Sequence, residues 1–187
     1  RALADEDAFY AVRFDCAAID RPDMDAERDG VMQAVYLCDV VRDYSERDEV
    51  SGADHRYGCS GIDGMGLGPV FGAEKNSPKK LMIAYGIYSD PLRQDNDHQV
   101  ILQYDPSIFD AYGKSLNQLR PHHSGPDCCE VRYFLYTGNT NFGIQNLEYD
   151  AYTEDWIVAV YQGKKEQFSQ RVDAVLTHRI AGPIIFV

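Results

Sequence analysis

The chain has 187 residues, of which 44% are hydrophobic, and its 30 acidic and 18 basic residues give a net charge of −12 at pH 7. A chain of this length can form a globular core and bury roughly 70% of the surface that its unfolded form exposes. The negative charge repels phosphate backbones and anionic lipid headgroups, which argues against nucleic-acid binding and against attachment to membranes.

The apolar runs and the cysteines bear on where the protein resides. No apolar run reaches the roughly 18 residues that a membrane-spanning helix needs. The five cysteines are an odd number without the spacing of a disulfide framework, which favours reduced thiols. We therefore expect a soluble, cytoplasmic protein. Because the chain begins at Arg1 with neither Met nor a leader, we also expect a piece of a longer protein.

Short runs of β-branched and aromatic residues, bounded by Gly, Asp, Asn and Pro, predict an all-β protein. One helix is predicted from Pro106 to Leu119, because its apolar residues recur at helical spacing on one face. In chain order, strands are expected near residues 8–16, 32–42, 60–67, 80–88, 98–104, 130–137, 143–149, 155–162 and 171–177.

An apolar strand pattern recurs along the chain at intervals of about 74 residues. Its three copies align on Ala11, Ala84 and Ala159, and we expect these alanines to occupy equivalent, tightly packed strand positions. The first two copies lead through acidic loops into strands that open on Gln and close on Asp, at residues 33–39 and 99–105. The pattern predicts antiparallel units of four strands each.

Four antiparallel strands repeated along a chain resemble the blades of a β-propeller. The resemblance rests on the repeat pattern, without a named family signature. About two and a half units fit into residues 1–187, either as a single all-β domain or as a partial propeller. Because propellers close with four to eight blades, we expect several chains to complete one ring as a homo-oligomer. The alternative architecture is a β-sandwich whose hairpins look alike.

Two acidic residues hold the same position in two Gly-led strands: Asp63 and Glu148. In a propeller the first strand of each blade lines the channel, so the resemblance implies that both carboxylates face a common axis. Mutual repulsion would then raise the pKa of at least one of them. The predicted ligand-binding residues are Asp63, Glu148, Gln145, Asn146, His55 and Ser60.

The first functional hypothesis is a domain that binds a small polar ligand, such as a carbohydrate, at the channel or the loop face. The second is a glycoside hydrolase that uses the two carboxylates as acid and base. The third is a structural or protein-interaction subunit of a ring, in which the acids are paired with basic side chains.

Other motifs do not support a specific chemistry. Ser60 lacks the second glycine of a nucleophile elbow, and Gly61, Gly64, Gly66 and Gly68 lack dinucleotide-binding spacing, so we interpret them as a Gly-rich strand or a close backbone approach. Residues 25–30 resemble the start of a calcium loop, but Tyr36 stands where a bidentate Glu is needed. We predict no metal site or cofactor, with a loose calcium site as the alternative.

Overall fold

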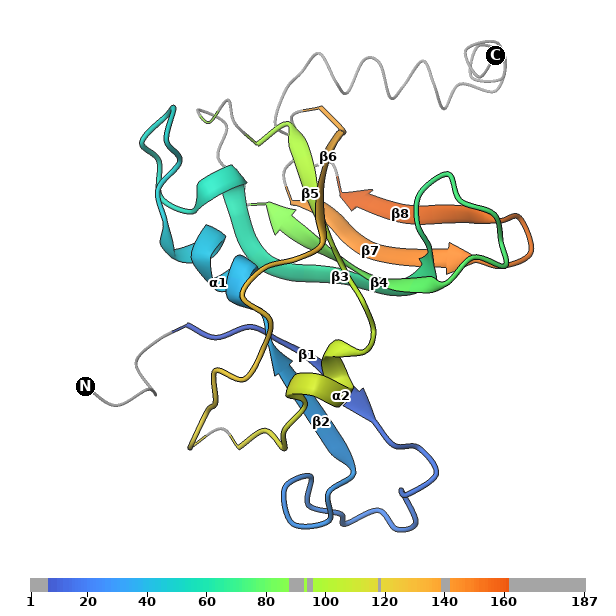
Figure 1. Ribbon diagram of the computed structural model, residues 1–187. Helices are drawn as coiled ribbons and strands as arrows, with labels where there is room; N and C mark the ends of the chain where they lie inside the picture. Colours follow the sequence, from blue (N-terminus) through green and yellow to red (C-terminus); the bar gives the residue numbers. More distant parts are fainter. Residues whose placement is uncertain (1–6, 88–92, 94–95, 118, 139–141, 162–187) are drawn as a thin grey trace.

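The computed structural model describes residues 7–87, 93, 96–117, 119–138 and 142–161. The protein is mostly β, with 42% of its residues in strands, as the sequence predicts. Its elements in chain order (Figure 1) are β1 (Tyr10–Phe14), β2 (Met32–Tyr36), α1 (Cys38–Ser45), the 3₁₀ turn η2 (Arg56–Gly58), β3 (Cys59–Pro69), β4 (Lys79–Ile87), β5 (His98–Tyr104), α2 (Ile108–Tyr112), β6 (Val131–Tyr136), β7 (Gly143–Asp150) and β8 (Asp155–Tyr161).

The predicted strands overlap the observed ones as far as the structure describes the chain, and the predicted strand at 171–177 lies outside the described residues. Two predictions were wrong in extent. The strand expected over 32–42 ends at Tyr36, and the chain then turns into α1, which buries Val40 together with the preceding Leu37. The helix expected from Pro106 to Leu119 is only α2, because the chain beyond Gly113 extends to pair Lys114 with Ala34 of β2.

The strands form two antiparallel sheets. β1 and β2 make a two-stranded ribbon, and the other six strands make a sheet in the order β6-β5-β4-β7-β8, with β3 also pairing with β4. The larger sheet curls into a half-barrel. Its central strand β4 pairs with β3 along one edge and with β5 and β7 along the other. The described strands therefore form one large sheet and one ribbon, and the expected repeat of four-stranded units is not confirmed.

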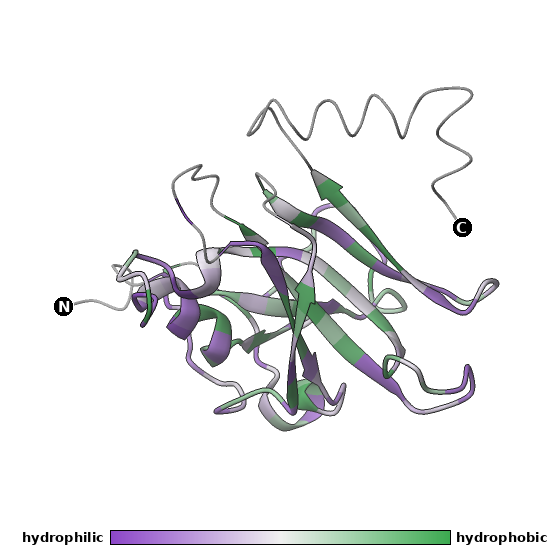
Figure 2. Cartoon of the chain, turned by 90° about the horizontal axis from the view of Figure 1, so that it is seen from above, coloured by the Kyte–Doolittle hydropathy of each residue, from purple (hydrophilic) through white to green (hydrophobic). Residues whose placement is uncertain are grey.

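Strand β4 is buried on both faces, which explains its continuous apolar sequence. Successive side chains of a strand point to opposite faces, so β4 contributes to two separate cores. One core contains Leu81, Ile83 and Tyr85 and is covered by residues of β1, β2, α1 and α2. The other contains Met82 and Ala84 and is covered by the β7–β8 hairpin. In Figure 2 hydrophobic colour follows the central strands, and the β7–β8 turn is hydrophilic.

The glycines of β3 let the β7–β8 hairpin approach closely. A Cβ placed on Gly64 would lie 2.9 Å from the backbone nitrogen of Leu147, and one on Gly66 would lie 2.8 Å from the Leu147 carbonyl oxygen. A Cβ on Gly68 would lie 2.6 Å from the ring of Trp156. These distances are too short for a real side chain. The close backbone approach expected from the glycine pattern is therefore present.

The three repeat alanines do not occupy equivalent environments. Ala11 and Ala84 are buried and pair with Val35 and Ile101 respectively, each two residues after the Gln that opens the second strand. Ala159 is exposed on β8 and pairs with Asn146 of the preceding strand. The expectation of three packed alanines was wrong at Ala159, because the inner face of β8 carries Trp156 and Val158 instead.

Candidate functional site

Three of the six residues predicted to bind ligand lie where strands β3 and β7 bulge. Strand β3 gains extra residues against β4 between Cys59 and Ile62 and again between Ile62 and Gly64, which places Ser60 and Asp63 in the two bulges. Strand β7 bulges between Ile144 and Asn146, at Gln145. Bulges redirect side chains away from the regular ladder and are frequent beside functional sites.

The side chains of Ser60, Asp63 and Gln145, which we call the bulge niche, gather next to Gly86 of β4. A Cβ on Gly86 would lie 1.7 Å from Oδ2 of Asp63 and 2.6 Å from Oγ of Ser60, so both side chains use the space that the glycine leaves. Gln145 Nε2 donates a hydrogen bond of 3.4 Å to Asp63 Oδ2 and another of 3.0 Å to the Phe142 carbonyl.

The carboxyl of Asp63 has a perturbed pKa. Burial raises the pKa of Asp63 above its usual value, and the hydrogen bond from Gln145 opposes part of that rise. The sequence predicted a raised pKa on the ground of repulsion from Glu148. The cause is instead desolvation, since Glu148 does not contribute to the shift.

The other three predicted residues, Glu148, Asn146 and His55, make their contacts outside the bulge niche. Glu148 and Asn146 are exposed on β7, where they pair in register with Ile157 and Ala159. His55 lies beside α1, where its Nδ1 is 2.6 Å from the Tyr44 carbonyl oxygen. Among the described residues, no hydrogen bond joins these three side chains to the niche.

The sequence interpretation missed a buried charge network centred on α1. Asp43 is fully buried, and its Oδ1 accepts a hydrogen bond of 2.8 Å from Arg56 Nε. Its Oδ2 accepts from Tyr85 at 2.9 Å and from Arg132 Nη1 at 2.7 Å. The second guanidinium nitrogen of Arg132 donates to Asp39 at 3.2 Å. The i, i+4 spacing of the two aspartates would have revealed the network if residues 38–45 had been interpreted as a helix.

This network has a structural character. Every carboxylate oxygen of Asp39 and Asp43 accepts at least one hydrogen bond, and the Arg56 and Arg132 guanidinium groups both lie over the ring of Tyr57. Two cysteines lie next to this network, and burial of their thiols raises the pKa of Cys59 to about 12 and that of Cys129 to about 11. Both thiols are therefore held in the weakly nucleophilic protonated form at neutral pH.

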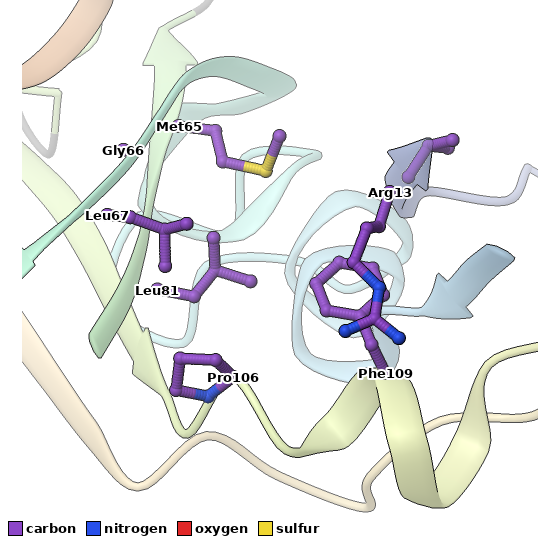
Figure 3. Close-up of a pocket in the computed structure, with 8 residues that line it drawn as sticks. Arg13, Met65, Gly66, Leu67, Leu81, Pro106 and Phe109 are labelled. Carbon is purple, nitrogen blue, oxygen red and sulfur yellow. The ribbon is translucent and has the colours of Figure 1, made fainter. Parts of the chain in front are cut away.

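An apolar pocket of about 310 Å³ lies between the β1–β2 ribbon and the large sheet. We call it the Arg13 pocket, after the charged residue in its lining. Figure 3 shows Met65, Leu67 and Leu81 on one side of it, and Arg13 with Phe109 on the other. The full lining consists of Val12, Arg13, Met65, Gly66, Leu67, Leu81, Pro106 and Phe109.

A second apolar cleft of about 320 Å³ lies between strands β5 and β6 and the β7–β8 hairpin. None of the side chains that line this cleft is charged. It is lined by Phe71, Ile101, Tyr133, Phe134, Leu135, Leu147, Trp156 and Val158.

The acidic loop that resembles the start of a calcium site uses its carboxylates for protein contacts. Asp29 Oδ2 accepts from the Asp25 amide at 2.8 Å and pairs with Arg21 at 2.8 Å. Glu27 pairs with Arg120 and Asn117. Within the described residues, no group of three or more His, Cys, Asp or Glu side chains is arranged to hold a metal ion.

No model of a protein family matches the chain, and neither a curated protein nor a solved structure matches it. Over the part of the chain that the structure describes, none of the helices combines the length and apolar character that crossing a bilayer requires.

Proposed function

We propose that this protein is a ligand-binding β-domain that recognises a small polyhydroxylated molecule, such as a carbohydrate, at the bulge niche. The observation that carries the proposal is the convergence of Ser60, Asp63 and Gln145 on the space beside Gly86. Three polar side chains from two bulged strands meet there, and one of them is a partly desolvated carboxyl with a raised pKa.

The chemistry of the niche suits a ligand that carries several hydroxyl groups. A carboxylate accepts hydrogen bonds, an amide both donates and accepts them, and a serine hydroxyl does either. Vicinal hydroxyls of a sugar or polyol can satisfy such a set, since each is both donor and acceptor. The 3.4 Å bond between Gln145 and Asp63 is long, so a ligand hydroxyl can compete with it.

Replacing Asp63 by Asn tests the proposal. The change keeps the shape of the side chain and removes the charged acceptor, so we expect binding to fall at least tenfold in a glycan array followed by calorimetric titration. The matched control is Glu148→Gln, which removes one negative charge from the same sheet at an exposed position. If Glu148→Gln abolishes binding as well, the ligand occupies the wider channel that the sequence predicts rather than the niche alone.

Hydrolysis of a glycosidic bond is the second candidate, and the raised pKa of Asp63 favours it. A general acid must hold its proton near the working pH. The second carboxyl of such a site would lie roughly 5–9.5 Å away, and Glu148 is the residue that the sequence predicts for this role. Turnover of a chromogenic glycoside by the wild type, lost in Asp63→Asn, would support the enzyme.

Self-association and a cytoplasmic location complete the proposal. Strand β6 stands at one end of the described sheet and exposes Val131, Phe134, Leu135 and Tyr136, which favours pairing with a second chain. A propeller-like ring of several chains stays a prediction, and sedimentation velocity of wild type against Leu135→Lys tests it.

A cytoplasmic location is the last part of the proposal. All five cysteines are free, as suits a reducing compartment.

A further inference from the structure

We propose that the Arg13 pocket is a second, separate binding site, whose ligand is an amphipathic anion with one aliphatic chain and one carboxylate. The inference is independent of the bulge niche. Met65 and Leu67 point away from the face on which Gly64, Gly66 and Gly68 meet the hairpin, because side chains alternate along β3. Binding at one site can therefore be tested without the other.

The walls of the pocket call for an apolar ligand. Leu81 and Phe109 are nearly buried, whereas Met65 and Leu67 leave 45% and 55% of their surface exposed. Exposed large apolar side chains that gather around a concavity mark a binding surface more often than scattered ones do. A volume of about 310 Å³ is at the lower end of the range for ligand pockets, which is roughly 300–1,000 Å³. A single aliphatic chain fits this volume better than a fused-ring compound.

The charge of the ligand follows from Arg13. Its guanidinium lies over the Phe109 ring, 5.1 Å from the ring centre, so the group is already oriented at the edge of the apolar wall. Its hydrogen bonds to Gln33 at 2.5 Å and to Asp110 at 2.9 Å both leave from Nη2. Among the described residues, Nη1 and Nε have no hydrogen-bond partner. A carboxylate that accepts from two guanidinium nitrogens forms one of the strongest pairs available to a ligand. Each edge of the guanidinium that offers two parallel N–H groups includes Nη2, so such a carboxylate takes the place of Asp110 at Nη2 and adds a bond from Nη1 or Nε.

The ion pair between Arg13 and Asp110 does not prevent a ligand carboxylate from binding Arg13. The side chains of Arg13 and Asp110 are 46% and 75% exposed, and such exposed pairs contribute little to stability. Asp110 can return to water when a ligand carboxylate takes its place. The net charge of −12 repels anions at long range, so the attraction for the ligand carboxylate comes from Arg13 at short range.

The test uses decanoate as the probe, with decanol and decylammonium as uncharged and cationic references, in calorimetric titrations of the full chain. We expect decanoate to bind at least tenfold more tightly than decanol, and decylammonium to bind most weakly. Carboxyl-labelled decanoate followed by carbon NMR should show the pKa of the ligand carboxyl lowered on binding, because the guanidinium favours its charged form.

Two variants should act in opposite directions. Arg13→Gln should reduce decanoate binding about tenfold and leave decanol binding unchanged, whereas Asp110→Asn should tighten decanoate binding by removing its competitor. Arg47→Gln is the matched control, because Arg47 also forms an exposed ion pair but lies outside the pocket. Equal binding of decanoate and decanol to the wild type, or no binding of either, would overturn the proposal. So would unchanged decanoate affinity in both pocket variants, and Asp110→Asn keeps the test valid if Arg13→Gln does not fold.

Discussion

Asp43 is the residue whose replacement should be most damaging to the fold. It is fully buried, and its two oxygens accept hydrogen bonds from Arg56, Arg132 and Tyr85. Replacing it by Ala leaves two guanidinium groups without their shared counter-ion, so we expect the free energy of unfolding to fall by about 3–5 kcal/mol. Urea denaturation measures the loss. The control is Asp54→Ala, which removes a 68% exposed partner of Arg47 and should change stability by less than about 1 kcal/mol. Equal losses in the two variants would contradict a special role for the network.

The cysteines provide a second test at the residue scale. The thiolate is the reactive form, and burial raises the pKa of Cys59 to about 12. Cys16 and Cys128 are exposed. In a thiol-labelling experiment near pH 8, mass spectrometry of peptides should find Cys16 and Cys128 modified first and Cys59 modified only when the protein unfolds. Early labelling of Cys59 in the native state would show that the core around Asp43 opens readily.

At the scale of elements, the packing of β3 against the β7–β8 hairpin requires glycine, which has no side chain, at the positions of β3 that face the hairpin. Gly68→Ala would place a methyl group 2.6 Å from the Trp156 ring and 2.7 Å from Tyr149. Backbone and rings must then move apart, and we expect a loss of about 1–3 kcal/mol. The chain has one tryptophan, so its fluorescence reports on this contact directly. Met65→Ala, on the opposite face of the same strand, should leave the Trp156 spectrum unchanged, and an unshifted spectrum in Gly68→Ala would argue against tight packing.

The elements that the sequence predicts well are those with a strong local pattern. The unbroken apolar run of β4 and the alternation in β3 can be recognised from neighbouring residues alone. Helix α1 was missed because Val40 and Val41 favour a strand locally, whereas burial of Leu37 and Val40 in the core favours the helix. Local propensity is a weak guide where tertiary packing opposes it.

The candidate site was predictable only in part, for a related reason. The sequence identifies Ser60, Asp63 and Gln145 as polar residues in strands, and the structure brings them together through bulges. Bulges arise from the register between strands, which a single sequence does not specify. The Arg13 pocket was not predicted at all, because its walls come from β1, β3, β4 and α2.

At the scale of the whole molecule, the shifted carboxyl groups predict how stability depends on pH. Partners lower the pKa of Asp29, Asp105, Glu130 and Asp150 in the folded state. A carboxyl with a depressed folded pKa stabilises the protein above its unfolded pKa, near 4, and that contribution is lost as the pH falls further. The raised pKa of Asp63 has the opposite sign, since its penalty appears only as the pH rises through this range. The four carboxyl groups with a lowered pKa outnumber the single carboxyl group with a raised pKa, so the folded protein should lose stability as the pH falls.

We therefore expect the melting temperature to fall as the pH drops from about 4 to 2. Lys80 is the variant that tests the cause, because its ammonium bonds Asp105 at 2.9 Å and Glu130 at 2.8 Å. In Lys80→Gln the decline should be shallower, since Asp105 and Glu130 both lose the largest cause of their lowered pKa values. Thermal melts at several pH values provide the comparison. Lys75→Gln is the control, because Lys75 pairs with exposed Glu154 and is the smallest of the causes that lower the pKa of Asp150. Parallel curves for wild type and Lys80→Gln would contradict the assignment.

The sequence separation within the charge network also determines when α1 can form during synthesis. Arg56 follows Asp43 by 13 positions, but Arg132 follows Asp39 by 93. A ribosome adds about 5–20 residues per second, so the nascent chain carries Asp39 for several seconds before Arg132 exists. Until then its arginine partner is Arg42, which is more exposed and lies farther away, at 3.6 Å. During that interval the two aspartates face each other one turn apart without Arg132, and like charges at this spacing weaken a helix. Helix α1 is then completed late, when β6 emerges and docks, and a stalled chain that ends before residue 132 should keep this segment open to proteases.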